Sequence, residues 1–408
     1  MADSARTISR DAEVIVVGAG PAGSTMAAAL AELGHDVLLL DKASFPRHKP
    51  CSDYVNPAGA QILAEMGLGD DLKCAGAHTM EGMLVHAPNG SRFLANYAQA
   101  EPGRAALGLS RYRLDNVLLE CAKAAGVTVC ERAHVREALR SGDSVTGVTA
   151  TIDGTLEEIR AKLVIGADGR NSAIVRSLGL SAATHWPRKT GLAAHYRGVN
   201  GLERYGEMHV GRDFYAGLAI LECGLTNVTI VVGDNLLQRR SGSIEEFFAE
   251  SLRALPAIAS KLDSVERVGG IRGVGSMAHR ARQTVGNGYL LVGDAAAFLD
   301  PFAGEGIYEA LRAARLAAPI ASAALKSADA SARALAPYRA ARRRAFTAKR
   351  SVSWIVQGFI NSPSLMNYVT ERLAAREELG LTLSGVLGDF RPAGQALSPI
   401  FLARLLRP

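Results

Sequence analysis

Hydrophobic runs with few polar positions alternate with longer Ala- and Leu-rich segments in the first part of the chain. Runs such as Glu13–Val17, Asp36–Leu40 and Leu163–Ile165 lack the alternation of a half-exposed strand, which is typical of parallel strands buried on both faces. The segments between them predict helices, several of which end at a glycine. This pattern predicts an α/β fold with a parallel sheet. Helices are expected at about 24–33, 57–66, 114–125 and 306–325, and further strands at 127–130 and 289–292.

The pattern changes between residues 183 and 267. Short strand-like runs, Gly217–Leu221 and Asn227–Val232, are separated by loops, and a helix is expected near Ile244–Leu252. This texture predicts an antiparallel sheet inserted into the α/β unit. The stretch Gly270–Gly275 is expected to be a loop, because no strand–turn–helix context surrounds its glycines. From about residue 340 the chain is predicted to be helical.

The composition narrows the class of protein. The 408 residues, 48% of them hydrophobic, are enough for two or three domains with large cores. The net charge of +6 is too small to indicate nucleic-acid binding. None of the five cysteines stands in a Cys-x-x-Cys pair, so neither a disulfide framework nor a metal site is expected. Residues 1–11 are polar and are expected to form a loose leader, so the expected location is cytoplasmic.

A glycine motif follows the first strand. Gly18-x-Gly20-x-x-Gly23 stands between a strand and a helix, and Asp41 follows the next strand. In such a unit two glycines allow a tight turn and the close approach of a pyrophosphate, and the third lets the helix pack on the strand. The helix N-terminus offers unpaired N–H groups to the phosphates, and the acid accepts hydrogen bonds from an adenosine ribose. The motif therefore predicts dinucleotide binding.

Two later segments also lead from a strand into a glycine turn. Leu163–Gly169 includes Asp168 and precedes a helix, and taken alone it is equally consistent with an ordinary capped turn. Gly288–Ile307 places Asp294 at the end of a strand, where its carboxylate can bond the hydroxyl groups of a cofactor. The long helix that follows presents its N-terminus to the same region, where it can face a ring that gains negative charge on reduction.

The three motifs, in this order, resemble the FAD-dependent oxidoreductases with the p-hydroxybenzoate-hydroxylase-like fold, over roughly residues 11–340. Two loops resemble the geranylgeranyl reductase family most closely. Phe45–Cys51 is similar to its Arg-x-Lys-x-Cys-Gly loop, and Pro301–Ile307 is similar to its Pro-x-x-Gly-Glu-Gly-Ile segment. Ser110–Asp115 resembles the arginine segment that precedes a helix on the FAD face. The resemblance implies non-covalent FAD, with NADH or NADPH as a transient reductant.

The resemblance also implies an architecture and a set of cofactor contacts. It implies a Rossmann-like FAD-binding domain of the glutathione-reductase type formed by residues 11–75, 106–182 and 268–340. A mixed β-sheet substrate domain would be inserted over 76–105 and 183–267, and a helical C-terminal extension would cover 341–408. FAD contacts are implied for Gly18, Gly20, Pro21, Ala22, Gly23, Asp41, Lys42, Arg47, Arg111, Asp294, Pro301, Gly304, Glu305, Gly306 and Ile307.

The function expected from this resemblance is that of an FAD-dependent oxidoreductase acting on a hydrophobic small molecule or carrier-bound metabolite, by hydride transfer through flavin N5. Two alternatives stay open: an NAD(P)H- and O2-dependent monooxygenase of an aromatic or polyketide-like substrate, and a non-catalytic flavin-binding or electron-transfer module. The chain departs from the prenyl reductases in two places: Ser52 replaces a glycine, and their Trp-x-Phe-Pro segment is absent. The Trp-x-Trp-x-Ile-Pro segment of flavin-dependent halogenases is also absent.

Four side chains are candidates for contact with the substrate. Cys51 and Arg47 are the candidate catalytic residues, because their loop would lie beside the substrate. Cys51 is comparably consistent with a small packing residue. His209 and Tyr215 are candidate substrate contacts on the inserted sheet, where structural residues are the commoner case.

A basic run, Arg342–Arg350, lies in the predicted C-terminal helices. Such a run is most often a solvated helix face. The alternative is docking to an anionic membrane surface or an acidic carrier protein, helped by the nearby Trp354, which would make the protein a peripheral membrane protein.

Overall fold

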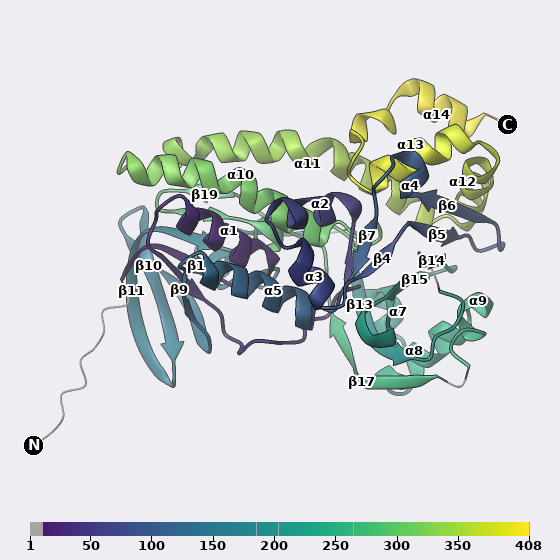
Figure 1. Cartoon of the computed structure of the whole chain (residues 1–408), viewed down its shortest axis with the longest axis horizontal. Coiled ribbons are helices and arrows are strands. Elements are labelled where there is room, and N and C mark those ends of the chain that lie inside the picture. The colour runs from purple at the N-terminus through teal and green to yellow at the C-terminus, as the bar shows by residue number, and fades with distance from the viewer. Residues whose placement is uncertain (1–10, 185, 203, 264, 408) are drawn as a thin grey trace, which may run out of the picture.

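The computed structural model describes residues 11–184, 186–202, 204–263 and 265–407. The expected leader lies, except for Asp11, outside these residues. Figure 1 shows an α/β half at one end of the molecule and a second half, built on another sheet, at the end where the C-terminal helices lie. None of the helices in the described ranges is long and apolar enough to cross a membrane.

The first half is organised around a sheet whose central strands are parallel, as the hydrophobic runs predict. β1 (Ala12–Val17) lies between β2 (Val37–Leu40) and β11 (Thr155–Gly166), and residues 14–17 are buried. Asp153 and Gly154, both at positive φ, form the turn that joins β10 to β11. The other strands of this sheet are β8 (Thr128–Cys130), β9 (Ala133–Ser141), β10 (Ser144–Ile152), β19 (Val285–Gly286) and β20 (Tyr289–Leu291).

Alanine-rich helices pack closely on one face of this sheet. α1 (Pro21–Glu32) begins directly at the glycine motif and lies against α5 (Arg111–Ala124) and α10 (Gly306–Lys326). Small side chains on α1 and α10 bring the two helices together over the strands and form one buried cluster with them. Shorter helices complete this half: α2 (Pro57–Glu65), α3 (Gly69–Cys74) and α6 (Ala173–Ser177).

A seven-stranded mixed sheet forms the second half. Its order is β17 (Glu266–Val274), β13 (Lys189–Arg197), β16 (Leu225–Gly233), β15 (Phe214–Ile220), β14 (Tyr205–Val210), β5 (Gly82–His86) and β6 (Arg92–Asn96). All neighbours are antiparallel except β14 and β5. The sheet thus draws strands from residues 76–105 and 183–267, and β17 extends past residue 267.

The expectation of a loop at Gly270–Gly275 is wrong. Most of this stretch lies in β17, whose backbone pairs with β13, for example Val274 with Gly191 and Arg272 with Ala193. Pairing along a whole neighbouring strand outweighs the weak strand preference of glycine, and a sequence pattern confined to the stretch does not reveal it.

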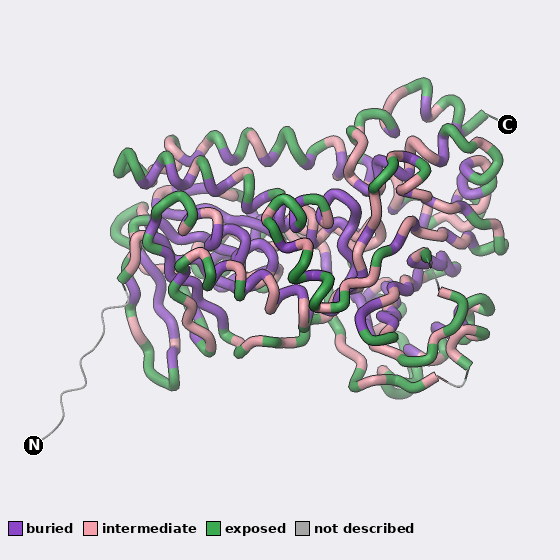
Figure 2. Tube along the Cα trace, viewed as in Figure 1, coloured by how far each residue is buried: buried purple, intermediate pink, exposed green. Residues whose placement is uncertain are grey.

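Helices cover both faces of the second sheet. One face packs against α7 (Asp234–Gln238), α8 (Ile244–Arg253) and α9 (Pro256–Ala259). The other packs against α12 (Pro363–Ala375), α13 (Glu377–Leu387) and α14 (Pro399–Leu406), which lie beside β5 and β6 in Figure 1. Figure 2 shows buried residues in the interior of each half of the molecule. The remaining elements are β3 (Tyr54–Val55), β4 (His78–Met80), α4 (Tyr97–Ala100), β7 (Ala106–Gly108), β12 (Ser181–Ala182), β18 (His279–Ala281) and β21 (Ala297–Phe298).

One long helix connects the two halves. α11 (Ala332–Ile360) contributes Tyr338 and Phe346 to the core of the first half, and Val352 and Ile360 to that of the second. The Tyr338 hydroxyl donates a hydrogen bond to the carbonyl of Leu291 in β20, at 3.0 Å. The C-terminal extension is therefore part of both cores.

We expect Gly23→Ala to destabilise the fold. A Cβ atom at Gly23 would lie 1.7 Å from the carbonyl oxygen of Gly18, so α1 would have to move off β1. Overpacking of this kind costs about 3 kcal/mol. Chemical denaturation should show this loss. The control is Gly358→Ala, at an exposed position of α11 where a Cβ atom meets nothing within 4 Å. This variant should stabilise the protein by up to about 1 kcal/mol. Equal stability of both variants would contradict this account.

Candidate functional site

A cleft of about 520 Å³ lies between the glycine motif of the first half and strands of the second sheet. It brings together segments that are far apart in the sequence. Most of the residues expected to contact the cofactor line it, as does the candidate catalytic Cys51. The expected residues in its lining are Gly18, Gly20, Pro21, Ala22, Asp41, Lys42, Arg47, Cys51, Arg111, Asp294, Pro301, Gly304, Gly306 and Ile307.

The glycine motif forms a cradle for a pyrophosphate. A Cβ atom at Gly20 would occupy space 3.6 Å from a guanidinium nitrogen of Arg111 and 3.8 Å from one of Arg47. Gly20 is also the N-cap of α1, and no side chain caps the N–H groups there. Two guanidinium groups and a helix N-terminus thus face one small space beside a residue without a side chain, which suits a dianion. Gly23 lies beneath this cradle, against Gly18.

Buried carboxylates hold the two arginines in place. Asp115, which is fully buried, accepts hydrogen bonds from Nε and Nη2 of Arg111 at 2.5 and 2.7 Å. It also pairs with Nη1 of Arg47 at 2.9 Å. The backbone N–H of Arg111 donates to Asp53, whose other oxygen lies 2.7 Å from Nε2 of His195. Asp53 has a positive φ of 54°, and no local motif marked it in the sequence.

Two further acids border the cleft. The carboxylate of Asp41 accepts hydrogen bonds from the backbone N–H groups of Ala19 and Ala43, at 2.7 and 2.8 Å, which fixes it at the end of β2. Asp168 bonds the N–H of Ala173 through Oδ2, while its buried Oδ1 has no partner among the described residues. Burial raises the pKa of Asp168. The unpartnered oxygen and the cradle at Gly20 fit a cofactor that carries both hydroxyl groups and phosphates.

Cys51 lies in the cleft as a neutral thiol. Burial raises the pKa of this thiol, although the charge of Arg111 opposes the shift. Asn227, on β16, donates to the carbonyl of Cys51 at 2.9 Å and so ties the loop to the second sheet. A protonated thiol can donate a proton, whereas a nucleophile would need the thiolate. Arg47, the other candidate catalytic residue, is occupied by its ion pair with Asp115.

The loop from Asp300 to Gly306 is held at its first residue by the second sheet. We call it the flavin loop, because the family resemblance predicts FAD contacts for it. The Tyr215 hydroxyl donates to Oδ1 of Asp300 at 2.7 Å, and Nζ of Lys189 lies 3.6 Å from Oδ2. Lys189 also donates to Gln357 of α11 at 2.5 Å. Tyr215 thus anchors the flavin loop. Tyr215 is not among the described residues that line the cleft.

A second buried lysine holds the other end of the flavin loop. Nζ of Lys349, on α11, lies 3.3 Å from Oε1 of Glu305 and 3.1 Å from Oδ1 of Asp389. It also donates to the carbonyl of Val386 at 2.7 Å. Asn56, which caps α2, donates to Asp389 at 2.7 Å. Burial raises the pKa values of Glu305 and Asp389, and Lys349 opposes both shifts.

Glu305 therefore turns away from the cleft, toward Lys349. The sequence did not predict a role for Lys189 and Lys349, because each is far along the chain from the carboxylate with which it pairs. The basic run is also not a single solvated face: Lys349 is buried, and Arg342 is buried over the ring of Phe346. Of its basic residues, Arg343 and Arg344 are the exposed ones.

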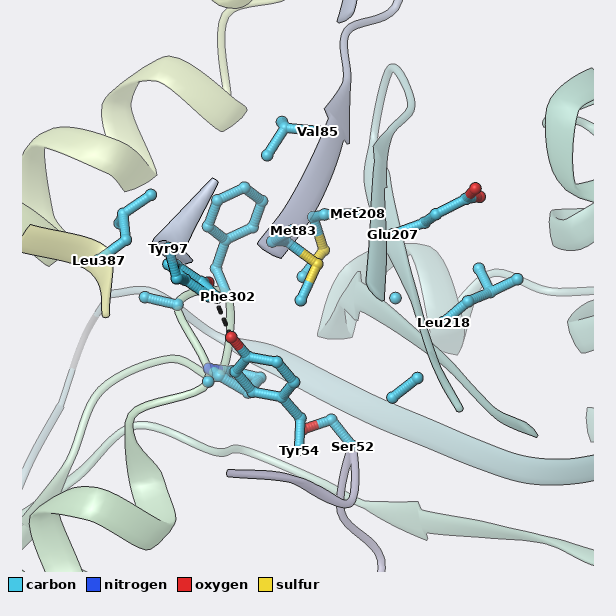
Figure 3. Close-up of a pocket in the computed structure, with 15 residues that line it drawn as sticks. Ser52, Tyr54, Met83, Val85, Tyr97, Glu207, Met208, Leu218, Phe302 and Leu387 are labelled. Carbon is cyan, nitrogen blue, oxygen red and sulfur yellow. Dashed lines mark hydrogen bonds between the residues drawn. The ribbon is translucent and has the colours of Figure 1, made fainter. Parts of the chain in front are cut away.

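Two apolar cavities continue from the cleft. The inner cavity, about 50 Å³, shares Ser52, Tyr54 and Gly304 with the cleft. Figure 3 shows Met83, Met208 and Phe302 around it, with the Tyr54 and Tyr97 hydroxyls hydrogen-bonded at 2.7 Å. The distal cavity, about 70 Å³, shares Val85, Phe302 and Leu387 with the inner one. It lies among α11–α14 and its lining is almost wholly apolar.

The candidate substrate residue His209 is not brought to these cavities. It lies on the opposite face of β14 from Met208, where Nε2 is 2.8 Å from Oε2 of Glu207. Figure 3 shows the Glu207 carboxylate pointing away from the inner cavity.

Comparisons with known proteins identify the family and the fold of the chain. A family model described as "FAD binding domain" matches residues 11–352. Digeranylgeranylglycerophospholipid reductase 2 of Methanopyrus kandleri is 32% identical over 80% of this chain and 81% of its own. A geranylgeranyl bacteriochlorophyll reductase-like structure from Thermoplasma acidophilum superimposes with a TM-score of 0.80 at 20% identity, over 95% of this chain and 99% of that one. The flavin-dependent brominase Bmp2 superimposes with a TM-score of 0.81 at 20% identity, over 93% of each chain.

We expect Lys349→Met to weaken FAD binding, because it leaves Glu305 and Asp389 buried without their cation and frees one end of the flavin loop. Losing one partner of a buried ion pair costs about 3–5 kcal/mol of stability. Flavin fluorescence titration and chemical denaturation measure the two effects.

The double variant Lys349→Met/Glu305→Gln should recover part of both losses, since it removes one of the two stranded charges. Arg343→Met, on the exposed side of the same helix, is the matched control and should leave both unchanged. If the double variant is no better than Lys349→Met alone, the pairing of Lys349 with Glu305 does not hold the loop.

Proposed function

Because the chain belongs to the FAD-binding domain family, as a flavin-dependent oxidoreductase, we propose that it is a reductase that adds hydrogen across carbon–carbon double bonds of a long-chain lipid. The observation that carries this proposal is the row of apolar cavities that begins beside the cleft and ends among α11–α14. Such a row suits an extended, flexible hydrocarbon chain rather than a compact aromatic ring. The match to a digeranylgeranylglycerophospholipid reductase supports the same substrate class.

Reduction of a double bond needs a hydride at one carbon and a proton at the other. Bound FAD, once reduced, supplies the hydride through N5. We assign the proton to the Cys51 thiol, which stays protonated at neutral pH because burial raises its pKa. Ser52 and Tyr54 follow Cys51 closely in the sequence, and both border the cleft and the inner cavity. In this proposal Arg47 and Arg111 hold the FAD pyrophosphate, and the flavin loop lies along the ring.

We propose NADH or NADPH as the reductant. Lys42, Arg170 and Arg176 line the cleft and give part of it a positive charge that attracts the phosphates of a nicotinamide dinucleotide.

The first test of this function uses the FAD-loaded protein, reduced anaerobically, with detergent-solubilised digeranylgeranylglycerophospholipid. We expect mass spectrometry to show a gain of two hydrogen atoms for each reduced double bond, and NADH or NADPH to bleach the flavin. The reduced protein mixed with oxygen should return to the oxidised spectrum in a single phase. A long-lived intermediate spectrum, with an oxygen atom found in the product, would overturn the reductase proposal in favour of a monooxygenase.

Matched variants of the same assay test the cavities. Val356 lines the distal cavity, so Val356→Phe should fill that cavity and Val356→Leu should change it little. We expect Val356→Phe to raise KM at least tenfold for the long-chain lipid and to leave a short prenyl analogue unaffected. If Val356→Phe and Val356→Leu have the same KM for the long-chain lipid as for the short analogue, the hydrocarbon chain of the lipid does not lie in the distal cavity.

We also propose that the protein collects this substrate from an anionic membrane surface rather than from an acidic carrier. Trp186 and Trp354 stack with ring centroids 4.9 Å apart, and each is 44% exposed. Arg343 and Arg344 are exposed on the same helix as Trp354. Exposed tryptophan with basic residues is the pattern of interfacial attachment.

Sedimentation with phosphatidylglycerol vesicles tests the attachment. The FAD-loaded protein should bind these vesicles, and Trp354→Ala should weaken binding at least about tenfold, while vesicles of phosphatidylcholine alone should bind little. Leu156→Ala, at an exposed position on β11, is the control. Equal binding by Trp354→Ala and the unmodified chain would contradict the proposal.

A further inference from the structure

Sheet geometry brings three metal-binding side chains together on the face of the second sheet that points away from the inner cavity. β5 and β14 are parallel neighbours, and their register pairs His86 directly with His209. Glu207 stands two residues before His209, so its side chain lies on the same face. One ligand atom from each of the three residues lies within 4.8 Å of the others.

The cluster is enclosed and one of its nitrogen atoms has no partner. Glu207 and His209 are 5% and 3% exposed, and His86 is half-buried beside them. The two imidazole rings lie parallel, with centroids 4.1 Å apart. Nε2 of His86 is buried and has no hydrogen-bond partner among the described residues. A buried polar atom without a partner needs an explanation, and an ion is one of the few that fit.

The three side chains supply donor atoms of the kinds that a divalent metal ion binds. Burial, and after it the neighbouring His209, lowers the pKa of His86 to about 4. Burial raises the pKa of Glu207, but hydrogen bonds from His209 and Lys261 outweigh it and hold that pKa below its ordinary value. The set is therefore two imidazoles and a carboxylate, which suits zinc and similar divalent ions.

We propose that His86, Glu207 and His209 bind a divalent transition-metal ion such as zinc. The ligands are Nε2 of each histidine and Oε2 of Glu207, and the ion takes the place of the hydrogen bond between Oε2 of Glu207 and Nε2 of His209. Lys261 lies 3.2 Å from Oε1 of Glu207 and donates to the carbonyl of Gly201 at 2.9 Å, so it holds the second carboxylate oxygen. The remaining coordination position is taken by water on the side of His86, the least buried of the three.

This ion would join two parts of the chain that are far apart in the sequence. β5 and β14 form the one parallel pair among the described strands of the second sheet. The opposite faces of the same strands present Met83, Val85 and Met208 to the inner cavity. The metal would therefore brace the wall of that cavity from behind, without contact with its contents.

The test measures zinc bound to the FAD-loaded protein. Protein treated with a chelator is dialysed against graded zinc concentrations, and bound metal is determined by elemental analysis. We expect about one zinc per chain, and a rise in Tm on binding. His86→Gln should lower the affinity at least about tenfold, since it removes a ligand. Lys261→Met should raise it, because a positive charge near the ion is lost.

A matched control separates this site from other zinc-binding groups. Nε2 of His78 is also buried and unpartnered, but His78 belongs to no such cluster among the described residues. His78→Gln should therefore bind zinc as tightly as the unmodified chain. FAD content confirms that each variant is folded. Absence of a zinc site, or equal affinity in His86→Gln and His78→Gln, would overturn the proposal.

Discussion

The pairing of two buried lysines with carboxylates of the flavin loop is the constraint on which the site depends. This loop is held at Asp300 by Lys189 and at Glu305 by Lys349. Both lysines are also tied to α11 or to the helices after it, through Gln357 and Asp389. Since a buried charge without its partner is costly, the first sheet, the second sheet and the C-terminal helices are committed to one arrangement.

Because of these ion pairs, the C-terminal extension is part of the site and of the cores. α11 enters both cores, and α12–α14 close the distal cavity. Asp389 lies in the segment that joins α13 to α14. The same general fold supports a brominase and a geranylgeranyl bacteriochlorophyll reductase-like protein, so the fold does not select the reaction. The features of this chain that bear on the proposed reaction are the loop that carries Cys51 and the apolar space that the last helices enclose.

Local patterns predicted the features that depend on neighbouring residues. The parallel strands, the glycine motif and Asp41 were all visible because each requires particular residue types at fixed spacing, and the structure brings Gly18, Gly20 and Asp41 to one cleft. Features that depend on distant pairing were not visible. β17 becomes a strand only because β13 lies beside it, and neither the position of Lys349 nor the orientation of His209 has a signature in the surrounding sequence.

The pairing of β5 with β14 has a consequence for how the chain folds. β5 has an early partner in β6, but that hairpin cannot join the second sheet until β14 has been made, much later in the chain. Closing so long a loop is slow, and the edge of a two-stranded hairpin is unprotected until it happens. During synthesis, therefore, the edge of the β5–β6 hairpin stays unpaired while residues 97–204 are added, and the hairpin is open to aggregation over that period.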